Sequence, residues 1–270
     1  MDKKASANDQ AELGQVEIRI AHTATDAALI SDLFDKVWDV KSMVSPEIMT
    51  ASLHNGGYGS VVYIGHKGDK GDKRVGEHRV VVGAAFALVG KALPGCIGPN
   101  LHSHATGVLP EFVGMGIGEK IKRHQWHWAK ENGFDTITWT FDPLVRRNAH
   151  FNLVKLGASV IGYHQNFYGE LDDGINAGEQ SDRVLVRWNV AGVDAPLGNS
   201  FMKPAPEAML IETPADIEQL RKTDRVQSDA WRSQQRAAFE SARLSDLRVV
   251  GLTDDFSYVL DKRVETGGAL

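Results

Sequence analysis

A glycine-rich segment near the middle of the chain has the residue types of an anion-binding loop. Residues 107–120 read Gly-Val-Leu-Pro-Glu-Phe-Val-Gly-Met-Gly-Ile-Gly-Glu-Lys, so a predicted strand runs into a glycine turn and the turn into a predicted helix. Glycine permits positive φ and lets the backbone approach a ligand closely. The first N–H groups of a helix have no partner within the helix and carry partial positive charge. We therefore expect this segment to bind an anionic group such as a pyrophosphate.

The spacing of the glycines distinguishes between the phosphate-loop patterns. A Walker loop fails because Glu119 occupies the position of its second glycine. The fingerprint Gly-x-Gly-x-x-Gly fails whether it starts at Gly114 or at Gly116, because no glycine falls at its last position. A third pattern, Gln/Arg-x-x-Gly-x-Gly/Ala, fits at residues 116–118, and Val-x-Pro-Glu at 108–111 precedes it. The segment thus resembles the acyl-coenzyme A (acyl-CoA) loop of the GNAT superfamily of acyltransferases.

A second segment extends the resemblance. Residues 148–158, Asn-Ala-His-Phe-Asn-Leu-Val-Lys-Leu-Gly-Ala, are similar to the GNAT helix that ends in Tyr-x-Lys-Leu-Gly-Phe. The order of the predicted elements also matches, so the resemblance covers about residues 16–190. Residues 167–169, 176–178 and 181–183, with Trp188, resemble a bacterial subgroup of predicted acetyltransferases. For this subgroup the resemblance suggests amino acids as acceptors and succinyl-CoA as a donor.

The resemblance implies a place for each part of the co-substrate, which is acetyl-CoA or another acyl-CoA. The strand before the loop, from Thr106 to Val108, would bind the pantetheine arm through its backbone. Asn148, at the start of the second helix, would also contact coenzyme A. The pyrophosphate would lie against the backbone N–H groups of the loop. These loop residues are Val113, Gly114, Met115, Gly116, Ile117 and Gly118.

Two positions depart from the family pattern. Val113 stands where the family has Gln or Arg, so we expect backbone donors to hold the pyrophosphate, assisted by Lys120 or Lys122. Leu153 stands where the family has a tyrosine that protonates the leaving thiolate. Tyr163 and Tyr168 are the candidates to replace that acid. For each of them the alternative is a packed tyrosine whose hydroxyl is satisfied structurally.

Two histidines on the predicted strand before the loop could serve as the base. Attack on a thioester needs a neutral amine, so a group with a pKa near 7 is useful. Strand alternation places His102 and His104 on one face. In the histone-acetyltransferase-like members of the superfamily, the base on this strand lies six residues before its last valine, which here is His102. The alternative is a histidine pair lining a polar cleft; no third ligand is evident for a metal, and none is expected.

The adjacent residues Asp182 and Arg183 have two interpretations. The first is a structural ion pair between them. In the second, Arg183 binds a carboxylate of the substrate or of a succinyl group, because its planar fork accepts carboxylates bidentately.

Composition restricts the classes of partner. The chain has 270 residues, of which 42% are hydrophobic and 24% charged, as in a globular protein rather than a disordered one. Its net charge of -5 provides no basic footprint for nucleic acid or anionic lipid. The single cysteine, Cys96, excludes an internal disulfide, and residues 1–15 do not resemble a secretory signal. We expect a cytoplasmic protein with a small-molecule amine substrate, without nucleic-acid or membrane partners, and with homodimerisation as an option.

The predicted elements indicate an α+β fold with a mixed sheet, GNAT-like, with a small C-terminal α/β extension. Helices are expected after an N-cap at Thr25, after Ser45, and over 119–131 and 146–156. Expected strands are 16–20, 61–64, 79–89, 101–109, 136–141, 160–167 and 183–190. The predicted organisation is a disordered tail at 1–15, an acyl-CoA-binding catalytic domain at 16–195 and the extension at 196–270. The extension would contain strands at 209–212, 248–252 and 257–260 and helices at 215–222 and 227–242.

These observations predict an N-acyltransferase that moves an acetyl or succinyl group from acyl-CoA to a primary amine of a small molecule, with amino acids as one class of acceptor. The amine would attack directly in a ternary complex. The alternative is a non-catalytic acyl-CoA-binding or regulatory module, motivated by Val113 and Leu153. An aminoacyl-tRNA-dependent transferase is a third interpretation, disfavoured by the acidic charge. The extension would pack over the substrate side or form a dimer contact.

Overall fold

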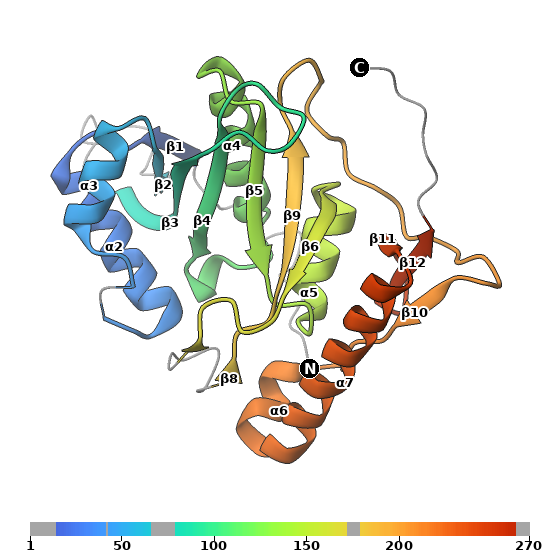
Figure 1. Cartoon of the computed structure of the whole chain (residues 1–270). Coiled ribbons are helices and arrows are strands. Elements are labelled where there is room, and N and C mark those ends of the chain that lie inside the picture. Colours follow the sequence, from blue (N-terminus) through green and yellow to red (C-terminus); the bar gives the residue numbers. More distant parts are fainter. Residues whose placement is uncertain (1–14, 42, 66–78, 172–178, 263–270) are drawn as a thin grey trace. The chain divides into compact units, whose positions relative to one another are not determined.

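The computed structural model describes residues 15–41, 43–65, 79–171 and 179–262 (Figure 1). The predicted tail up to residue 14 and the similarity at 176–178 lie outside these residues. The chain divides into two compact units. The first comprises residues 1–137 and 189–195, and the second comprises 138–188 and 196–270. One change of unit falls between Ala195 and Pro196.

The first unit contains a meander of strands that pair antiparallel in chain order. The strands are β1 (Val16–Ile20), β2 (Tyr58–Gly65), β3 (Arg79–Gly90) and β4 (Asn100–Val108). The helices are α2 (Ala24–Trp38), α3 (Pro46–His54), the 3₁₀ helix η1 (Pro110–Phe112) and α4 (Ile117–Glu131). Helix α2 begins at a capping box between Thr23 and Asp26, so the prediction of Thr25 as the N-cap is wrong. The predicted cap Ser45 is confirmed, with its side chain accepting from the Ile48 N–H.

Helices cover both faces of this meander. A Cβ added at Gly107 of β4 would lie 3.0 Å from Trp38 of α2, whereas one added at Gly83 of β3 would lie 3.2 Å from Ile121 of α4. The face toward α2 and α3 forms an apolar core that includes Phe34. The face toward α4 carries several polar side chains, which are described below. Burial of the apolar face stabilises this unit at about 25 cal/mol per Å² of apolar surface.

The second unit contains three sheets or parts of sheets. Strand β5 (Thr136–Phe141) crosses the unit boundary, and β5, β9 (Arg183–Asn189) and β6 (Ser159–His164) are neighbours in that order. Strands β7 (Glu170–Leu171) and β8 (Glu179–Gln180) form a two-stranded sheet. Strands β10 (Met209–Ile211), β12 (Tyr258–Lys262) and β11 (Leu247–Leu252) form an antiparallel sheet in that order. The helices are α5 (Arg146–Ala149), the π-helical turn η2 (His150–Lys155), α6 (Ile217–Thr223) and α7 (Arg225–Leu244).

The extension shares a core with residues 138–188 within this unit. Leu144, Val145 and Ile217 form a buried cluster against which Leu220 and Trp231 pack.

The order of helices and strands confirms the α+β prediction, including the C-terminal α/β extension. Every strand and helix predicted in the described residues is present, with end points that shift by a few residues. Strands β7 and β8 were not predicted, because two residues carry too little periodicity to detect.

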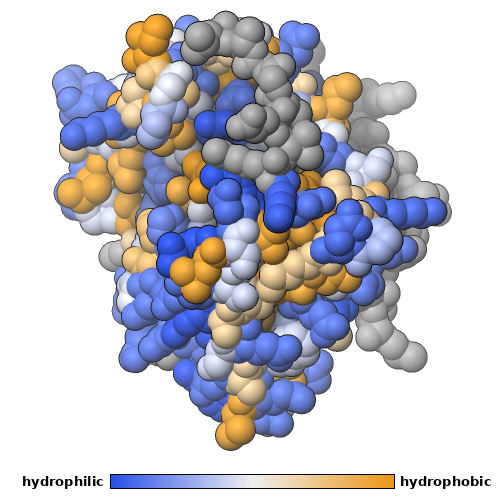
Figure 2. Space-filling view, turned by 45° about the vertical axis from the view of Figure 1, so that its right-hand side comes forward, coloured by the Kyte–Doolittle hydropathy of each residue, from blue (hydrophilic) through white to orange (hydrophobic). Residues whose placement is uncertain are grey.

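Within the described part of the chain, no helix combines the length and the hydropathy needed to cross a membrane. In the view of Figure 2, hydrophilic residues cover most of the face and hydrophobic residues lie among them in small groups.

Candidate functional site

The glycine loop has the backbone conformation that the sequence predicts. Gly114 has φ 89° and Gly116, the N-cap of α4, has φ 76°, a region that L-residues with side chains rarely adopt. A Cβ at either position would meet no atom within 4 Å, so both glycines face open space. No side chain of the described residues caps α4 at this end. The first N–H groups of a 15-residue helix are therefore available to an anion.

The side chains around the loop are arranged differently from the prediction. Val113 is 63% exposed, as expected for a residue that contributes only backbone. Lys120 is exposed at the start of α4, where it remains a candidate to assist an anion. Lys122 is only 3% exposed, and its Nζ donates to Ser103 Oγ and to Gln125 Oε1, each at 3.0 Å. Lys122 is thus held under α4, and its predicted help at the pyrophosphate is wrong.

The two histidines of β4 lie beside a β-bulge. Ala87 pairs with Ser103 and Phe86 with Ala105, so His104 is an extra residue on β4. The bulge leaves the alternation up to His104 in place, because His102 and His104 are half-buried whereas Leu101, Ser103 and Ala105 are buried. Both rings are half-buried, and the His104 ring lies 6.4 Å from the Phe86 ring in an edge contact.

The histidines are biased toward their neutral forms. Burial, followed by the charges of His104 and Lys122, lowers the pKa of His102 to about 4. Burial also lowers the pKa of His104. At pH 7 His102 is therefore neutral and able to accept a proton, but it is a weaker base than a group with a pKa near 7.

In the second unit the two candidate tyrosines differ. Tyr163 stacks on Phe239 at 4.4 Å, and its hydroxyl donates to Asp182 Oδ2 at 2.5 Å. Burial and the Asp182 carboxylate raise its pKa, so it has the structural role that was the alternative interpretation. Tyr168 is 39% exposed, and its hydroxyl lies 3.4 Å from Thr140 Oγ1. Tyr168 is the candidate with solvent access.

The helix that resembles the second GNAT segment changes character halfway along. It is α-helical over α5 and π-helical over η2, a form that recurs at functional sites. Asn148 is half-buried, and its backbone carbonyl accepts from Asn152 Nδ2 at 2.8 Å. Asn152 Oδ1 accepts from the Trp139 indole at 2.7 Å, and Leu153 is buried in the core. Asn152 is therefore structural, while the Asn148 side chain remains a candidate for the co-substrate.

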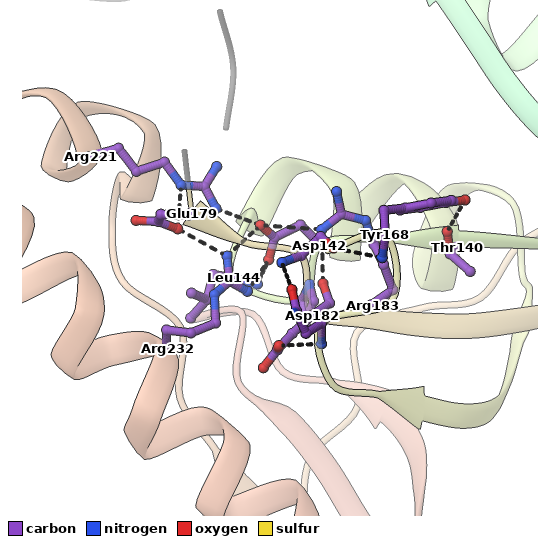
Figure 3. A network of polar contacts seen from close by, with 12 residues as sticks. Thr140, Asp142, Leu144, Tyr168, Glu179, Asp182, Arg183, Arg221 and Arg232 are labelled. Atoms are coloured by element: carbon purple, nitrogen blue, oxygen red, sulfur yellow. Dashed lines mark hydrogen bonds and ion pairs between the residues drawn. The ribbon is translucent and has the colours of Figure 1, made fainter. Parts of the chain in front are cut away.

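A buried ionic network occupies the second unit (Figure 3). Arg232 donates from two nitrogens to the two oxygens of Asp142, both at 2.8 Å, and lies 3.2 Å from Glu179 Oε2. Arg221 donates to Asp142 Oδ2 at 2.5 Å and to Glu179 Oε2 at 2.9 Å. Ser228 also donates to Glu179. Burial alone would raise the pKa of Asp142, but the charges of Arg232 and Arg221 hold it well below its usual range.

The expected ion pair between Asp182 and Arg183 does not form. Asp182 pairs with Arg236, whose Nη2 lies 2.6 Å from Asp182 Oδ1. Arg183 instead donates from Nη1 to the backbone carbonyl of Asp182 at 2.9 Å. Its guanidinium carbon lies 5.6 Å from the centre of the Tyr168 ring, within cation–π range. Asp182 lies just before β9, and its carboxylate is already held by Arg236 and by the Tyr163 hydroxyl.

Sequence reasoning missed most of this network. Asp142 follows β5 and Glu179 begins β8, and neither position belongs to a recognisable motif. Arg232 and Arg236 are four residues apart on α7, a spacing that places both on one face of the helix. The available signal for a buried ionic network was that these two arginines share a face of α7 with its buried apolar residues. Within the described residues, no group of three His, Cys, Asp or Glu side chains is placed to hold a metal ion.

The chain is similar in structure to several solved acetyltransferases, two of which are named as members of the GNAT superfamily. A phosphinothricin acetyltransferase from Sinorhizobium meliloti in complex with acetyl-CoA aligns with 68% of this chain and 95% of its own, at 16% identity and a TM-score of 0.46. A GNAT-family acetyltransferase from Streptococcus pneumoniae aligns with 66% of this chain and 100% of its own, at 14% identity and a TM-score of 0.45. An IAA acetyltransferase from Bacillus cereus aligns with 65% of this chain and 99% of its own, at 16% identity and a TM-score of 0.44.

No family model matches the sequence, and no curated protein matches it significantly. At TM-scores below 0.5 the structural likenesses do not by themselves assign an activity to this chain.

Proposed function

We propose that this chain is an acyl-CoA-dependent N-acyltransferase of the GNAT type, which transfers an acetyl or succinyl group to a primary amine of a small molecule. One observation carries the proposal: an uncapped helix N-terminus preceded by two exposed glycines with positive φ, within a sequence pattern that resembles the acyl-CoA loop. The open space at Gly114 and Gly116 suits a pyrophosphate approaching the backbone.

The proposed binding residues follow from that loop. The backbone N–H groups of Val113 to Gly118 would hold the pyrophosphate, and the backbone of Thr106 to Val108 would hold the pantetheine arm. Asn148 would add a side-chain contact. Fixed backbone donors need no reorganisation when they bind an anion, so the missing Gln or Arg at position 113 reduces the affinity without removing the site.

The proposed reaction is direct attack in a ternary complex. The amine nitrogen bonds to the thioester carbonyl carbon while a backbone N–H near Val108 stabilises the oxyanion. His102, or a water that it orients, takes the proton from the nitrogen, and His104 is the second candidate for that role. The carbon–sulfur bond then breaks, and the thiolate of coenzyme A takes a proton from Tyr168. Arg183 would bind a carboxylate on one of the substrates.

Two features support the alternative of an acyl-CoA-binding module without turnover. Leu153 removes the usual acid, and the low pKa of His102 weakens the base. The two proposals share the coenzyme A site and differ in whether thiol is released.

The test is thiol release from acetyl-CoA and succinyl-CoA, each incubated with a panel of amino acids and small amines. Turnover with one donor and one class of amine establishes the transferase. Tight binding of coenzyme A without turnover on any amine favours the binding module.

The proposed base makes a separate prediction. His102→Ala should lower kcat/KM by about 100-fold, since general base catalysis contributes on that order. The acid limb of the wild-type profile, expected near pH 4, should disappear, because above that pH His102 is the neutral form that accepts the proton. His104→Ala is the matched comparison on the same strand. An unchanged rate and profile in the His102 variant would place the base elsewhere.

A further inference from the structure

The arginine network joins two stretches of the chain that are far apart in sequence. Asp142, Glu179 and Arg183 belong to residues 138–188, whereas Arg221 and Arg232 come from α6 and α7 of the extension. All five side chains are buried. Figure 3 shows the arginines of the extension pointing at the two carboxylates.

The charges in this cluster do not cancel. The carboxylates of Asp142 and Glu179 are matched by Arg221 and Arg232, each of which contacts both of them. Arg183 is a third cation beside this balanced set. Its Nη1 lies 4.0 Å from Asp142 Oδ2, beyond hydrogen-bond distance.

Arg183 has donors left over. It is 8% exposed, and among the described residues its one hydrogen bond goes to the Asp182 carbonyl. A guanidinium has five N–H donors in a fixed fork, so the Nε and Nη2 groups retain capacity for a ligand. The Tyr168 ring, on which Arg183 rests, is 39% exposed and brings the cluster to the surface.

The extension explains why these donors stay available. Without Arg221 and Arg232, the two buried carboxylates would have Arg183 as their one cation in this cluster, which is energetically unfavourable. Arg183 would then be drawn into a close pair with Asp142. Arg221 and Arg232 satisfy both carboxylates instead. We propose that α6 and α7 act as counter-ion donors that leave Arg183 to bind a carboxylate of an acyl-transfer substrate. This inference rests on the proposed N-acyltransferase function, and it gives the extension a role in choosing the substrate.

The first experiment compares substrates that differ only in the carboxylate. One arm measures KM for an amino acid and for its amide, with acetyl-CoA as donor. The other measures KM for succinyl-CoA and for acetyl-CoA, with the amide as acceptor. Arg183→Met should raise KM about 10- to 100-fold for the carboxylate-bearing partner in one arm only, as expected for a charged hydrogen bond. Arg187→Met, on the same strand, should leave the ratio unchanged.

The second experiment tests the role of the extension. Arg232→Met should lose the same preference for the carboxylate, because Arg183 is then drawn to Asp142. Adding Asp142→Asn to that variant removes the competing carboxylate and should restore most of the KM ratio. A merely structural role for Arg232 predicts loss without recovery, and that result would overturn the counter-ion proposal. If Arg232→Met does not fold, the double variant is compared with the wild type directly, and an unrestored ratio again counts against it.

Failure of the proposed function can be distinguished from failure of this inference. If no donor and amine pair releases thiol, calorimetry with succinate and with N-acetylglycine measures carboxylate binding directly. Binding by the wild type that Arg183→Met loses supports the site. Equal binding by both proteins, or no binding by either, contradicts it, as does an unchanged KM ratio in an active Arg183→Met enzyme.

Discussion

The two compact units bury positive charge in different ways. In the first unit, Lys122 is 3% exposed, and its Nζ donates to the neutral side chains of Ser103 and Gln125. Burial lowers the pKa of Lys122 to about 7. In the second unit, Arg232 is also buried, at 6% exposed, but it faces the carboxylates of Asp142 and Glu179. Burial there opposes the charge, yet Asp142 and Glu179 raise the pKa of Arg232.

The difference shows that the partner, more than burial, decides whether a buried cation keeps its charge. A lysine among neutral groups loses its proton near neutral pH, whereas an arginine in a carboxylate network stays charged at every ordinary pH. The first unit should therefore respond to pH around neutrality. The stability of the second unit should fall when a charged partner is removed. Acid should lower it only at a pH below the usual range of a carboxyl pKa.

Removal of one arginine from the network should have the largest effect. Arg221→Met leaves Asp142 and Glu179 with fewer counter-ions, and breaking a buried pair costs about 3–5 kcal/mol. Urea denaturation at pH 7 measures the change in the free energy of unfolding. Arg243→Met, which removes an exposed pair with Glu240, is the control and should change stability little. Equal stability of both variants would mean that the buried network is not a structural requirement.

Replacement of Lys122 should change how stability depends on pH. Between pH 7 and 10.5 the unfolded lysine holds a proton that the folded one has released, so stability rises with pH through this window and is lost as pH falls through 7. Between pH 7.5 and 9.5 the free energy of unfolding of the wild type should rise by about 2–3 kcal/mol relative to that of Lys122→Met. Urea denaturation across this range measures it, with Lys120→Met as the exposed control on α4. Parallel curves for the wild type and Lys122→Met would contradict the account.

The smallest effect concerns His102. The charge of Lys122 contributes to lowering the pKa of His102, so Lys122→Met should raise that pKa from about 4. Titration of the imidazole C2–H resonance by nuclear magnetic resonance gives the value, and a His102→Gln spectrum assigns the peak. Lys120→Met, which removes an exposed lysine from the same helix, should leave the resonance unmoved. An unchanged His102 titration in Lys122→Met would show that burial alone sets its pKa.

Local patterns predicted the elements well because they depend on neighbours in sequence. The alternation at Val16–Ile20, the cap at Ser45 and the glycine loop all specify structure within a few residues. The loop was found because positive φ at an uncapped helix start requires glycine at those positions.

The long-range contacts could not be predicted in the same way. Asp142 meets Arg232 across 90 residues, and no periodicity connects them. The bulge at His104 depends on register with β3 rather than on the β4 sequence. The burial of Lys122 depends on Ser103 of another element, so its charged side chain suggested exposure instead.

The central claim is that acyl-CoA binds at the glycine loop. Gly116→Arg fills the space before the N-terminus of α4, and Gly133→Arg is its matched control. Both glycines have φ 76°, both would meet no atom within 4 Å, and they lie at opposite ends of α4. The two variants should carry the same backbone strain. Any difference between them in calorimetric titration with acetyl-CoA therefore comes from the arginine side chain in the loop. The account predicts that Gly116→Arg loses binding while Gly133→Arg keeps the wild-type affinity; unchanged affinity in Gly116→Arg would contradict it.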